Sequence, residues 1–150
     1  MNVVVVSDAT PLNYLVLIDA VELLPRLFSR ILIPPAVAAE LSSESAPPPV
    51  LEFVNKLPSW LEIISPKCVD YSLGLDAGET EAISLAVELG IKPILMDERK
   101  GRRVASRLGL LNFGTLAVLE QSAARGWIDF GEYIHPPPSN QFSDSRATGG

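Results

Sequence analysis

The chain has 150 residues, 47% of them hydrophobic, and a formal net charge of −6. This size and apolar content suit one domain with a substantial core. The single cysteine excludes an internal disulfide and favours a reducing, cytoplasmic setting, and no run of about 20 apolar residues suggests a membrane span. The acidic balance argues against a simple nucleic-acid binder but allows a nuclease whose carboxylates are offset by cations.

Strand-like and helix-like segments alternate from the start of the chain. Val3–Val6 and Ile31–Ile33 are apolar, β-branched runs typical of strands buried on both faces. Pro35 suits the first turn of a helix. The other elements predicted in this half are helices over 11–17, 21–28, 35–41 and 50–57, a proline-rich connector over 42–49, a strand over 60–64 suited to a sheet edge, and a loop over 65–74.

The strongest helical signal covers Ala77–Leu89, where apolar residues recur at helical spacing before Gly90. Strands alternating with helices predict an α/β fold with a mainly parallel sheet. We assign the domain to residues 1–132 and a disordered or partner-binding tail to 133–150. The remaining predicted elements are a strand over 94–96, a basic helix over 100–108, a strand at 110–111 and a helix over 115–125.

Two acidic residues directly follow predicted strands. Asp8 comes after Val3–Val6, and Asp97 comes after Ile94–Met96. In an open parallel sheet, ligands bind beyond the carboxyl ends of the strands, so these carboxylates converge if their strands are neighbours. The alternatives are that Asp8 merely caps the next helix and that Asp97 is a turn residue.

Two further acids lie on predicted helices. Glu40 follows the second strand by about two helical turns, and Glu79 lies three residues before Ala82, on the apolar stripe of its helix. Glu40 could instead be a solvated helix acid, and Glu79 could form a capping box with Asp76. Asp76 and Glu81 also compete with Glu79 for a place in the site.

Helix phase favours Glu79 among these three. The inward stripe consists of Ala82, Leu85, Ala86 and Leu89, whereas Glu81 is expected on a solvent-facing side with Ser84 and Glu88. Inward carboxylates are costly unless cations or protons balance them, and Mg²⁺ or Mn²⁺ prefers such oxygen ligands. Such metals can activate water and stabilise a leaving oxygen in phosphodiester hydrolysis. The predicted catalytic and metal-binding residues are Asp8, Glu40, Glu79 and Asp97.

Basic residues crowd the helix that follows Asp97. Arg99, Arg103 and Arg107 recur every four residues and therefore share one helix face. Such a face beside a metal site could hold a phosphate backbone, although it could also be an ordinary solvated face. With Thr10, these three arginines form the predicted substrate-binding set.

The ordered motifs resemble the PIN-domain superfamily over about residues 3–128. The likeness is greatest to a branch related to bacterial and archaeal toxin nucleases that carries an uncharacterised-domain label. The segments that carry the resemblance are VVVVSDATPLNYL at 3–15, ILIPPAVAAEL at 31–41, LDAGETEAISLA at 75–86, ILMDERKGRRVASRLGL at 94–110 and FGTLAVL at 113–119.

The resemblance implies a three-layer α/β/α sandwich, bound Mg²⁺ or Mn²⁺, and cleavage of single-stranded RNA. It places the family's acids on Asp8, Glu40 and Asp97, with a third near Glu79, where many relatives carry Asp. It leaves Glu98 and Asn112 as candidates for a supporting position. It also implies a toxin paired with an antitoxin protein and a homodimer, for which we expect exposed apolar residues on the early helices: Leu12, Tyr14, Leu15, Leu23 and Phe28.

Other enzyme classes lack their motifs. No G-x-G-x-x-G follows the first strand and no G-x-x-x-x-G-K-[ST] occurs, which argues against a nucleotide-binding fold. The sole histidine, His135, lies at the edge of the tail, and no G-x-S-x-G is present, which argues against a Ser-His-Asp hydrolase. A metal-dependent phosphatase or acyl hydrolase stays open on spacing alone. The main rival is a catalytically silent PIN-like domain that binds protein or RNA.

Overall fold

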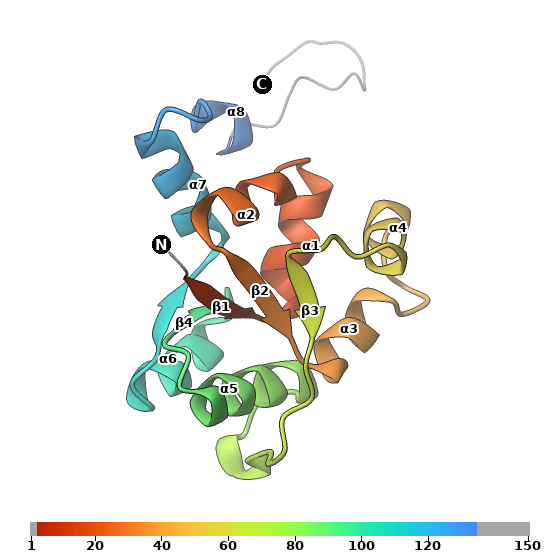
Figure 1. The fold of residues 1–150 in the computed structure, drawn as a ribbon, viewed down its shortest axis with the longest axis vertical. Helices are drawn as coiled ribbons and strands as arrows, with labels where there is room; N and C mark the ends of the chain where they lie inside the picture. The colour runs from red at the N-terminus through yellow and green to blue at the C-terminus, as the bar shows by residue number, and fades with distance from the viewer. Residues whose placement is uncertain (1–2, 135–150) are drawn as a thin grey trace. The chain divides into compact units, whose positions relative to one another are not determined.

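Five parallel strands form the central sheet of the computed structural model, which describes residues 3–134 (Figure 1). Their spatial order is β3-β2-β1-β4-β5, so β1 is central and β3 lies at an edge, as predicted for the 60–64 strand. Every pairing is parallel. The strands are β1 Val4–Ser7, β2 Arg30–Ile33, β3 Leu61–Ile63, β4 Pro93–Leu95 and β5 Leu111–Phe113.

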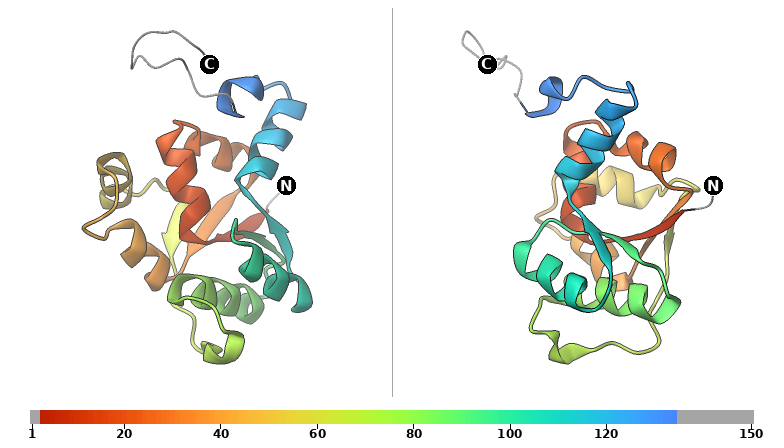
Figure 2. Two further views of the ribbon diagram at one scale, coloured as in Figure 1. Left: turned by 180° about the vertical axis from the view of Figure 1, so that it is seen from behind. Right: turned by 90° about the vertical axis from the view of Figure 1, so that its left-hand side faces the viewer.

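Helices cover both faces of this sheet, which confirms the predicted α/β/α sandwich. Figures 1 and 2 show α1 and α2 on one side and α5 and α6 on the other. The helices of the first unit are α1 Ala9–Leu17, α2 Leu24–Leu27, α3 Pro35–Leu41, α4 Pro48–Asn55, α5 Ala77–Leu89 and α6 Arg99–Arg107, with 3-10 turns over Val21–Leu23 and Tyr71–Leu73.

Prolines account for two differences in helix boundaries. The first helix was expected from Pro11 but begins at Ala9, and α4 was expected from Val50 but begins at Pro48. A proline is tolerated in the first turn because its missing N–H has no partner within the helix there. The sequence pattern therefore placed both starts two residues too late.

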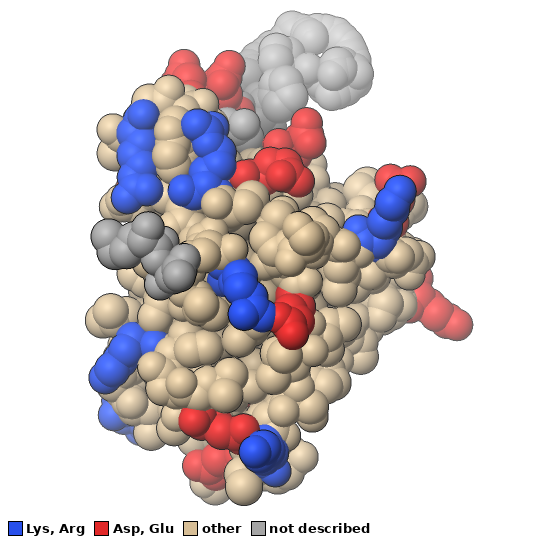
Figure 3. Space-filling model, in the orientation of Figure 1, with Lys and Arg blue, Asp and Glu red and all other residues tan. Residues whose placement is uncertain are grey.

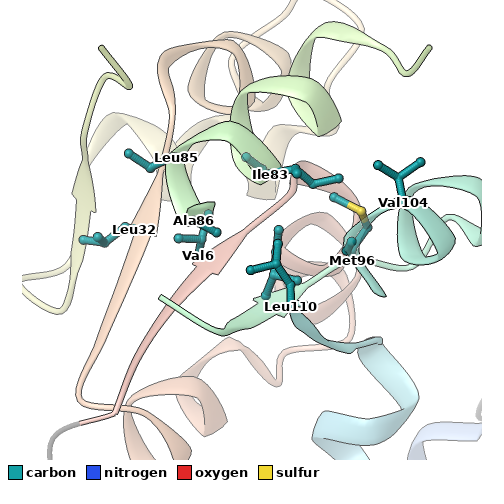
Figure 4. Packing of buried hydrophobic residues seen from close by; sticks show 11 residues of the cluster. Val6, Leu32, Ile83, Leu85, Ala86, Met96, Val104 and Leu110 are labelled. Atoms are coloured by element: carbon teal, nitrogen blue, oxygen red, sulfur yellow. The ribbon is translucent and has the colours of Figure 1, made fainter. Parts of the chain in front are cut away.

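The core on the α5 and α6 side joins the sheet to both helices. Val6, Leu32 and Met96 from the strands and their ends pack with Ile83 of α5 and Val104 of α6 (Figure 4). Side chains alternate between the faces of a strand, so the neighbours of these strand residues point toward α1 and α2.

Three of the apolar residues expected on the surface are buried. Leu12 and Leu15 are fully buried and Leu23 is 6% exposed, so they belong to the core and are not a docking surface. Phe28 is partly buried, and only Tyr14 is clearly exposed. The prediction also failed for Leu89 of α5, which is exposed although it lies on the helical stripe.

A second compact unit begins at Leu116. It contains nearly all of α7 Thr115–Ala124, and α8 Gly131–Ile134. After α7 the chain turns at Gly126, whose φ of 77° suits glycine, and Trp127 N–H donates to the carbonyl of Ser122. The tail predicted from residue 133 lies, from residue 135 on, outside the described residues. Within residues 3–134, no helix is long and apolar enough to cross a membrane.

Candidate active site

Asp8 and Asp97 leave neighbouring strands at the same edge of the sheet. Strand β1 pairs with β4 through Val6–Ile94 and Ser7–Leu95, and Asp8 N–H extends the ladder by donating to the Leu95 carbonyl at 2.9 Å. The two strands are therefore neighbours, which is the condition that the sequence analysis set for the two carboxylates to converge.

The two side chains nevertheless lie in different places. Asp8 follows β1 and lies next to Gly78 at the start of α5. Asp97 follows Met96 and lines a groove along α6.

Asp8 and Glu40 meet at the start of α5. A Cβ placed on Gly78 would lie 3.3 Å from Asp8 Oδ1 and 3.1 Å from Glu40 Oε1, so both oxygens approach one point from different elements. Glu40 is carried there by α3, which packs against α5. Because Gly78 has no side chain, the space between the two carboxylates stays open.

Glu79 joins this group while also capping its helix. Asp76 Oδ1 accepts from Glu79 N–H at 2.8 Å, and Glu79 Oε1 accepts from Asp76 N–H at 3.3 Å, which is a complete capping box. The other oxygen, Glu79 Oε2, lies 3.5 Å from the position of a Cβ on Gly101 in α6. The capping interpretation is therefore correct, and it leaves one oxygen of Glu79 facing α6.

Burial and the negative charge of neighbouring carboxylates make the ionised form of these acids unfavourable. Burial raises the pKa of Asp8 to about 7, against the lowering by the Ala9 N–H, and the charges of Glu79, Asp76 and Glu40 raise it further. The pKa values of Glu40 and Glu79 are raised as well, first by burial and then by the charge of Asp76. We call Asp8, Glu40, Asp76, Glu79 and Glu98 the acidic cluster, because Glu98 also raises the pKa of Glu79.

Asp97 has a different environment. Its Oδ1 accepts from Thr115 N–H at 2.7 Å, and its Oδ2 accepts from Thr115 Oγ1 at 2.6 Å. A Cβ on Gly114 would lie 2.7 Å from Oδ1, so only glycine allows this approach. Both carboxylate oxygens thus have donors at the start of α7, and the place of Asp97 in a metal site stays a prediction.

A family model described as a PIN domain matches residues 4–135. The chain belongs to the PIN-domain family. This confirms the family inferred from the motifs, and the five-stranded parallel sheet agrees with it. PIN domains are generally nucleases and typically use divalent metals. No curated protein matches the sequence significantly.

The carboxylate oxygens of this PIN domain are the kind of ligand that a hard cation binds. Their spacing in this structure does not yet form a metal site. The acidic cluster offers only carboxylate oxygens, the ligands that Mg²⁺ and Mn²⁺ favour, and a cation would relieve the mutual repulsion of Asp8, Glu40 and Glu79. Among residues 3–134, however, no group of three or more His, Cys, Asp or Glu side chains is gathered closely enough to hold an ion. The fit therefore rests on the donor set and on the open space at Gly78.

Glu81, which lies outside the acidic cluster, and Glu98, which belongs to it, both make hydrogen bonds that hold helix ends. Glu81 Oε1 accepts from Ala36 N–H at 2.9 Å and so fastens the start of α3 to α5. The prediction that this side of α5 faces solvent holds for Glu88, which is exposed, but is wrong for Ser84, which is buried and accepts from Asp70 N–H. Glu98 caps α6 by accepting from Lys100 and Gly101 N–H groups.

The predicted substrate arginines line a groove along α6. The groove has a volume of about 770 Å³ and includes Arg99, Arg103 and Arg107, all exposed, together with Asp97. Arg102 also lines it and is held by Asn112, whose Oδ1 accepts from Arg102 Nε at 2.8 Å. In contrast, the face drawn in Figure 3 carries small separate groups of both signs on a mostly uncharged surface.

Proposed function

We propose that this PIN domain is a Mg²⁺- or Mn²⁺-dependent endoribonuclease that hydrolyses phosphodiester bonds of single-stranded RNA. The single observation that carries the proposal is the meeting of Asp8 and Glu40 at Gly78, beside Glu79, whose charge raises the pKa of Asp8. The N-terminal residues of α6, which bears the arginine groove, border the same cluster.

The acidic residues would hold the cation and orient the attacking water. Asp8, Glu40 and Glu79 supply the ligands best supported by the geometry, and Asp97 completes the proposed set. When bound, the divalent cation supplies Lewis acidity and lowers the pKa of a coordinated water. Gly78 keeps a side chain out of the space between Asp8 and Glu40, whereas the absence of a side chain at Gly101 makes room for Met96.

The arginine groove would bind the RNA backbone. Arg99, Arg103 and Arg107 are exposed cations on a helix whose first turn lies against the acidic cluster. They offset the repulsion that the carboxylates exert on phosphates and make binding depend on salt. We assign Thr10 to the same substrate path, since it lines a second hollow together with Glu40.

RNA cleavage with metal and with chelator tests the proposal. Purified protein is incubated with a labelled RNA, the same RNA in a duplex, and a matching single-stranded DNA, each with Mn²⁺, Mg²⁺ or chelator. We expect metal-dependent cleavage of the single-stranded RNA and loss of that cleavage in Asp8→Asn. Asp19→Asn is the matched control, because Asp19 is exposed and Asn tolerates its φ of 59°. Cleavage that persists undiminished in chelator contradicts the proposal.

The second candidate is a catalytically silent PIN-like domain that binds RNA or protein. The complete capping box of Asp76 and Glu79 and the spacing of the carboxylates favour it, since both would exist without catalysis. This candidate predicts RNA binding with no cleavage in Mn²⁺ and no metal-induced rise in melting temperature. The two functions therefore give opposite results in the same assay.

We further propose a role as the toxin of a toxin–antitoxin pair, which is supported by the resemblance to the toxin-nuclease branch. Induced expression in a bacterial host should arrest growth, whereas Asp8→Asn should not. Normal growth with active, soluble protein would contradict the toxin role. A homodimer, also implied by that branch, predicts a concentration-dependent mass in light scattering; a monomer at every concentration contradicts it.

A further inference from the structure

A second hollow adjoins the acidic cluster and differs from the arginine groove in charge. It has a volume of about 340 Å³ and lies between α1 and the segment that joins α3 to α4. Glu40 belongs both to this hollow and to the acidic cluster. We call it the connector hollow; its lining on these two segments includes Thr10, Asn13, Tyr14, Ser43 and Ser45.

The lining of the connector hollow suits a neutral, planar, polar group. Thr10, Asn13, Ser43 and Ser45 provide hydroxyl and amide groups, and Glu40 is the one charged residue in its lining. A phosphate would be repelled there, since no cation lines the hollow to balance it. The amide and the hydroxyls can both donate and accept hydrogen bonds, as the edge of a nucleobase requires.

Tyr14 supplies the flat surface that such a group needs. Its side chain is 51% exposed although it belongs to α1, whose Leu12 and Leu15 are fully buried. An exposed ring beside polar groups is the arrangement on which unpaired bases stack. The volume of the hollow lies at the small end of the range for small-molecule pockets.

One helix links this hollow to the acidic cluster. Asp8 occupies the N-cap position of α1 and Tyr14 follows six residues later, about 9 Å along the helix axis. Glu40 lines the hollow and lies beside Asp8 at Gly78, so a base at Tyr14 would lie next to the acidic cluster.

We propose that the connector hollow binds one unpaired nucleobase of the RNA, next to the bond that is cut. Tyr14 stacks on the base, and Asn13 bonds to its edge. This inference rests on the proposed nuclease function and adds a base-specific subsite to it. It also explains a preference for single strands, because a base in the hollow cannot remain paired.

Nucleoside binding tests the subsite without requiring cleavage. Adenosine, guanosine, cytidine and uridine are titrated to millimolar concentrations into isotope-labelled full-length protein, and backbone amide shifts are followed. We expect at least one nucleoside to shift amides within residues 9–14 and 43–46. Ribose 5-phosphate, which lacks a base, should leave them unshifted. Tyr14→Ala should weaken that binding roughly 5- to 100-fold, the range for one base on one ring, and Tyr14→Phe should keep most of it.

A cleavage readout separates this proposal from the nuclease proposal. On an RNA of random sequence, Tyr14→Ala and Asn13→Ala should change the base preference beside the cut. Tyr71→Ala removes an exposed aromatic side chain elsewhere and should preserve the preference. RNA cleavage without nucleoside shifts, or equal shifts with ribose 5-phosphate, overturns the subsite and leaves the nuclease standing. Nucleoside binding without any RNA cleavage overturns the nuclease and keeps the subsite.

Discussion

Asp8 and Asp97 follow paired strands at one edge of the sheet, and their carboxylates have opposite surroundings. Asp8 is 4% exposed and its neighbours are acids, which with burial raise its pKa to about 7. Asp97 accepts two hydrogen bonds from Thr115. Asp8 is therefore held at a cost that a cation or a proton must offset, whereas hydrogen bonding already stabilises Asp97. The comparison teaches that position at a strand end does not by itself determine the surroundings of an acid.

The largest expected effect comes from removing the charge of Asp8. Asp8→Asn keeps the shape of the side chain but removes a proposed ligand at the centre of the cluster. We expect RNA cleavage to fall more than roughly 100-fold, beyond the loss typical of residues that only orient a ligand. Initial rates with Mn²⁺ measure this effect, with Asp19→Asn as control. A loss of less than tenfold would remove Asp8 from the catalytic set.

The raised pKa of Asp8 predicts an unusual dependence of stability on pH. Between about pH 4 and 7 the folded protein keeps a proton that the unfolded chain has lost, so stability falls as pH rises through this window. The penalty is complete above pH 7 and amounts to at most about 4 kcal/mol. The raised pKa values of Glu40 and Glu79 act in the same direction.

Denaturant unfolding in chelator, at intervals from pH 4.5 to 7.5, measures this slope. Asp8→Asn should remove most of the dependence of the free energy of unfolding on pH. In the wild type, Mn²⁺ should restore stability more at pH 7.5 than at pH 5, because ligands must be deprotonated. A free energy of unfolding that rises across the window in chelator would contradict the surroundings that we describe for Asp8.

Glu79 allows the two roles of an acid to be tested separately, because it caps α5 and also belongs to the acidic cluster. Glu79→Gln keeps an acceptor for Asp76 N–H and removes the charge beside Gly101. We expect a loss of cleavage similar to that of Asp8→Asn, with near-normal melting temperature. Asp76→Asn should mainly lower stability, and Glu81→Gln should be mild, since Gln can still accept from Ala36 N–H. Loss of activity in Glu81→Gln alone would reverse this assignment.

Asp97 is the other acid in the comparison, and its carboxylate is surrounded by hydrogen-bond donors of Thr115. Thr115→Val removes one donor from its carboxylate and should cost about 1 kcal/mol of stability while cleavage changes little. Asp97→Asn should remain folded and lose cleavage if Asp97 completes the metal site. Melting temperature and initial rate, measured together, decide this point. Full activity in Asp97→Asn would leave Asp97 as a residue that fixes the start of α7.

The sequence predicted the layers of the fold because its signals are local. Buried β-branched runs and helical stripes identified the strands, and the boundaries of α3 and α5 match the expectation. Strand ends and helix phase also singled out Asp8 and Glu79 as candidates, and the resemblance supported Glu40. These predictions needed no knowledge of how distant elements pack.

The remaining features depend on register and packing. The surroundings of Asp97 depend on Thr115, which lies 18 residues further along the chain, and no local pattern contains this contact. Asp76 and Glu98 reach the cluster because α3, α5 and α6 bring their ends together, and the connector hollow requires the packing of α1 against α3. Local signals could not show these contacts, although the Asp76–Glu79 spacing did signal the cap.

The smallest expected effect concerns the arginine groove, which is the cationic counterpart of the acidic cluster. Arg103 is exposed on α6 and lines the groove. Arg103→Gln should therefore weaken RNA binding by a similar factor for every sequence and reduce the slope of log K against log salt by roughly one. Lys56→Gln removes an exposed charge just after α4 and should leave the slope unchanged. Fluorescence anisotropy of labelled RNAs at several salt concentrations measures both variants. A phosphate contact changes the salt slope and not the sequence preference, whereas a base contact does the reverse. If Arg103→Gln changes the sequence preference and leaves the salt slope unchanged, Arg103 contacts bases and not the RNA backbone. If Arg103→Gln leaves the affinity for RNA unchanged, Arg103 belongs to an ordinary solvated helix face, which was the alternative that its spacing allowed.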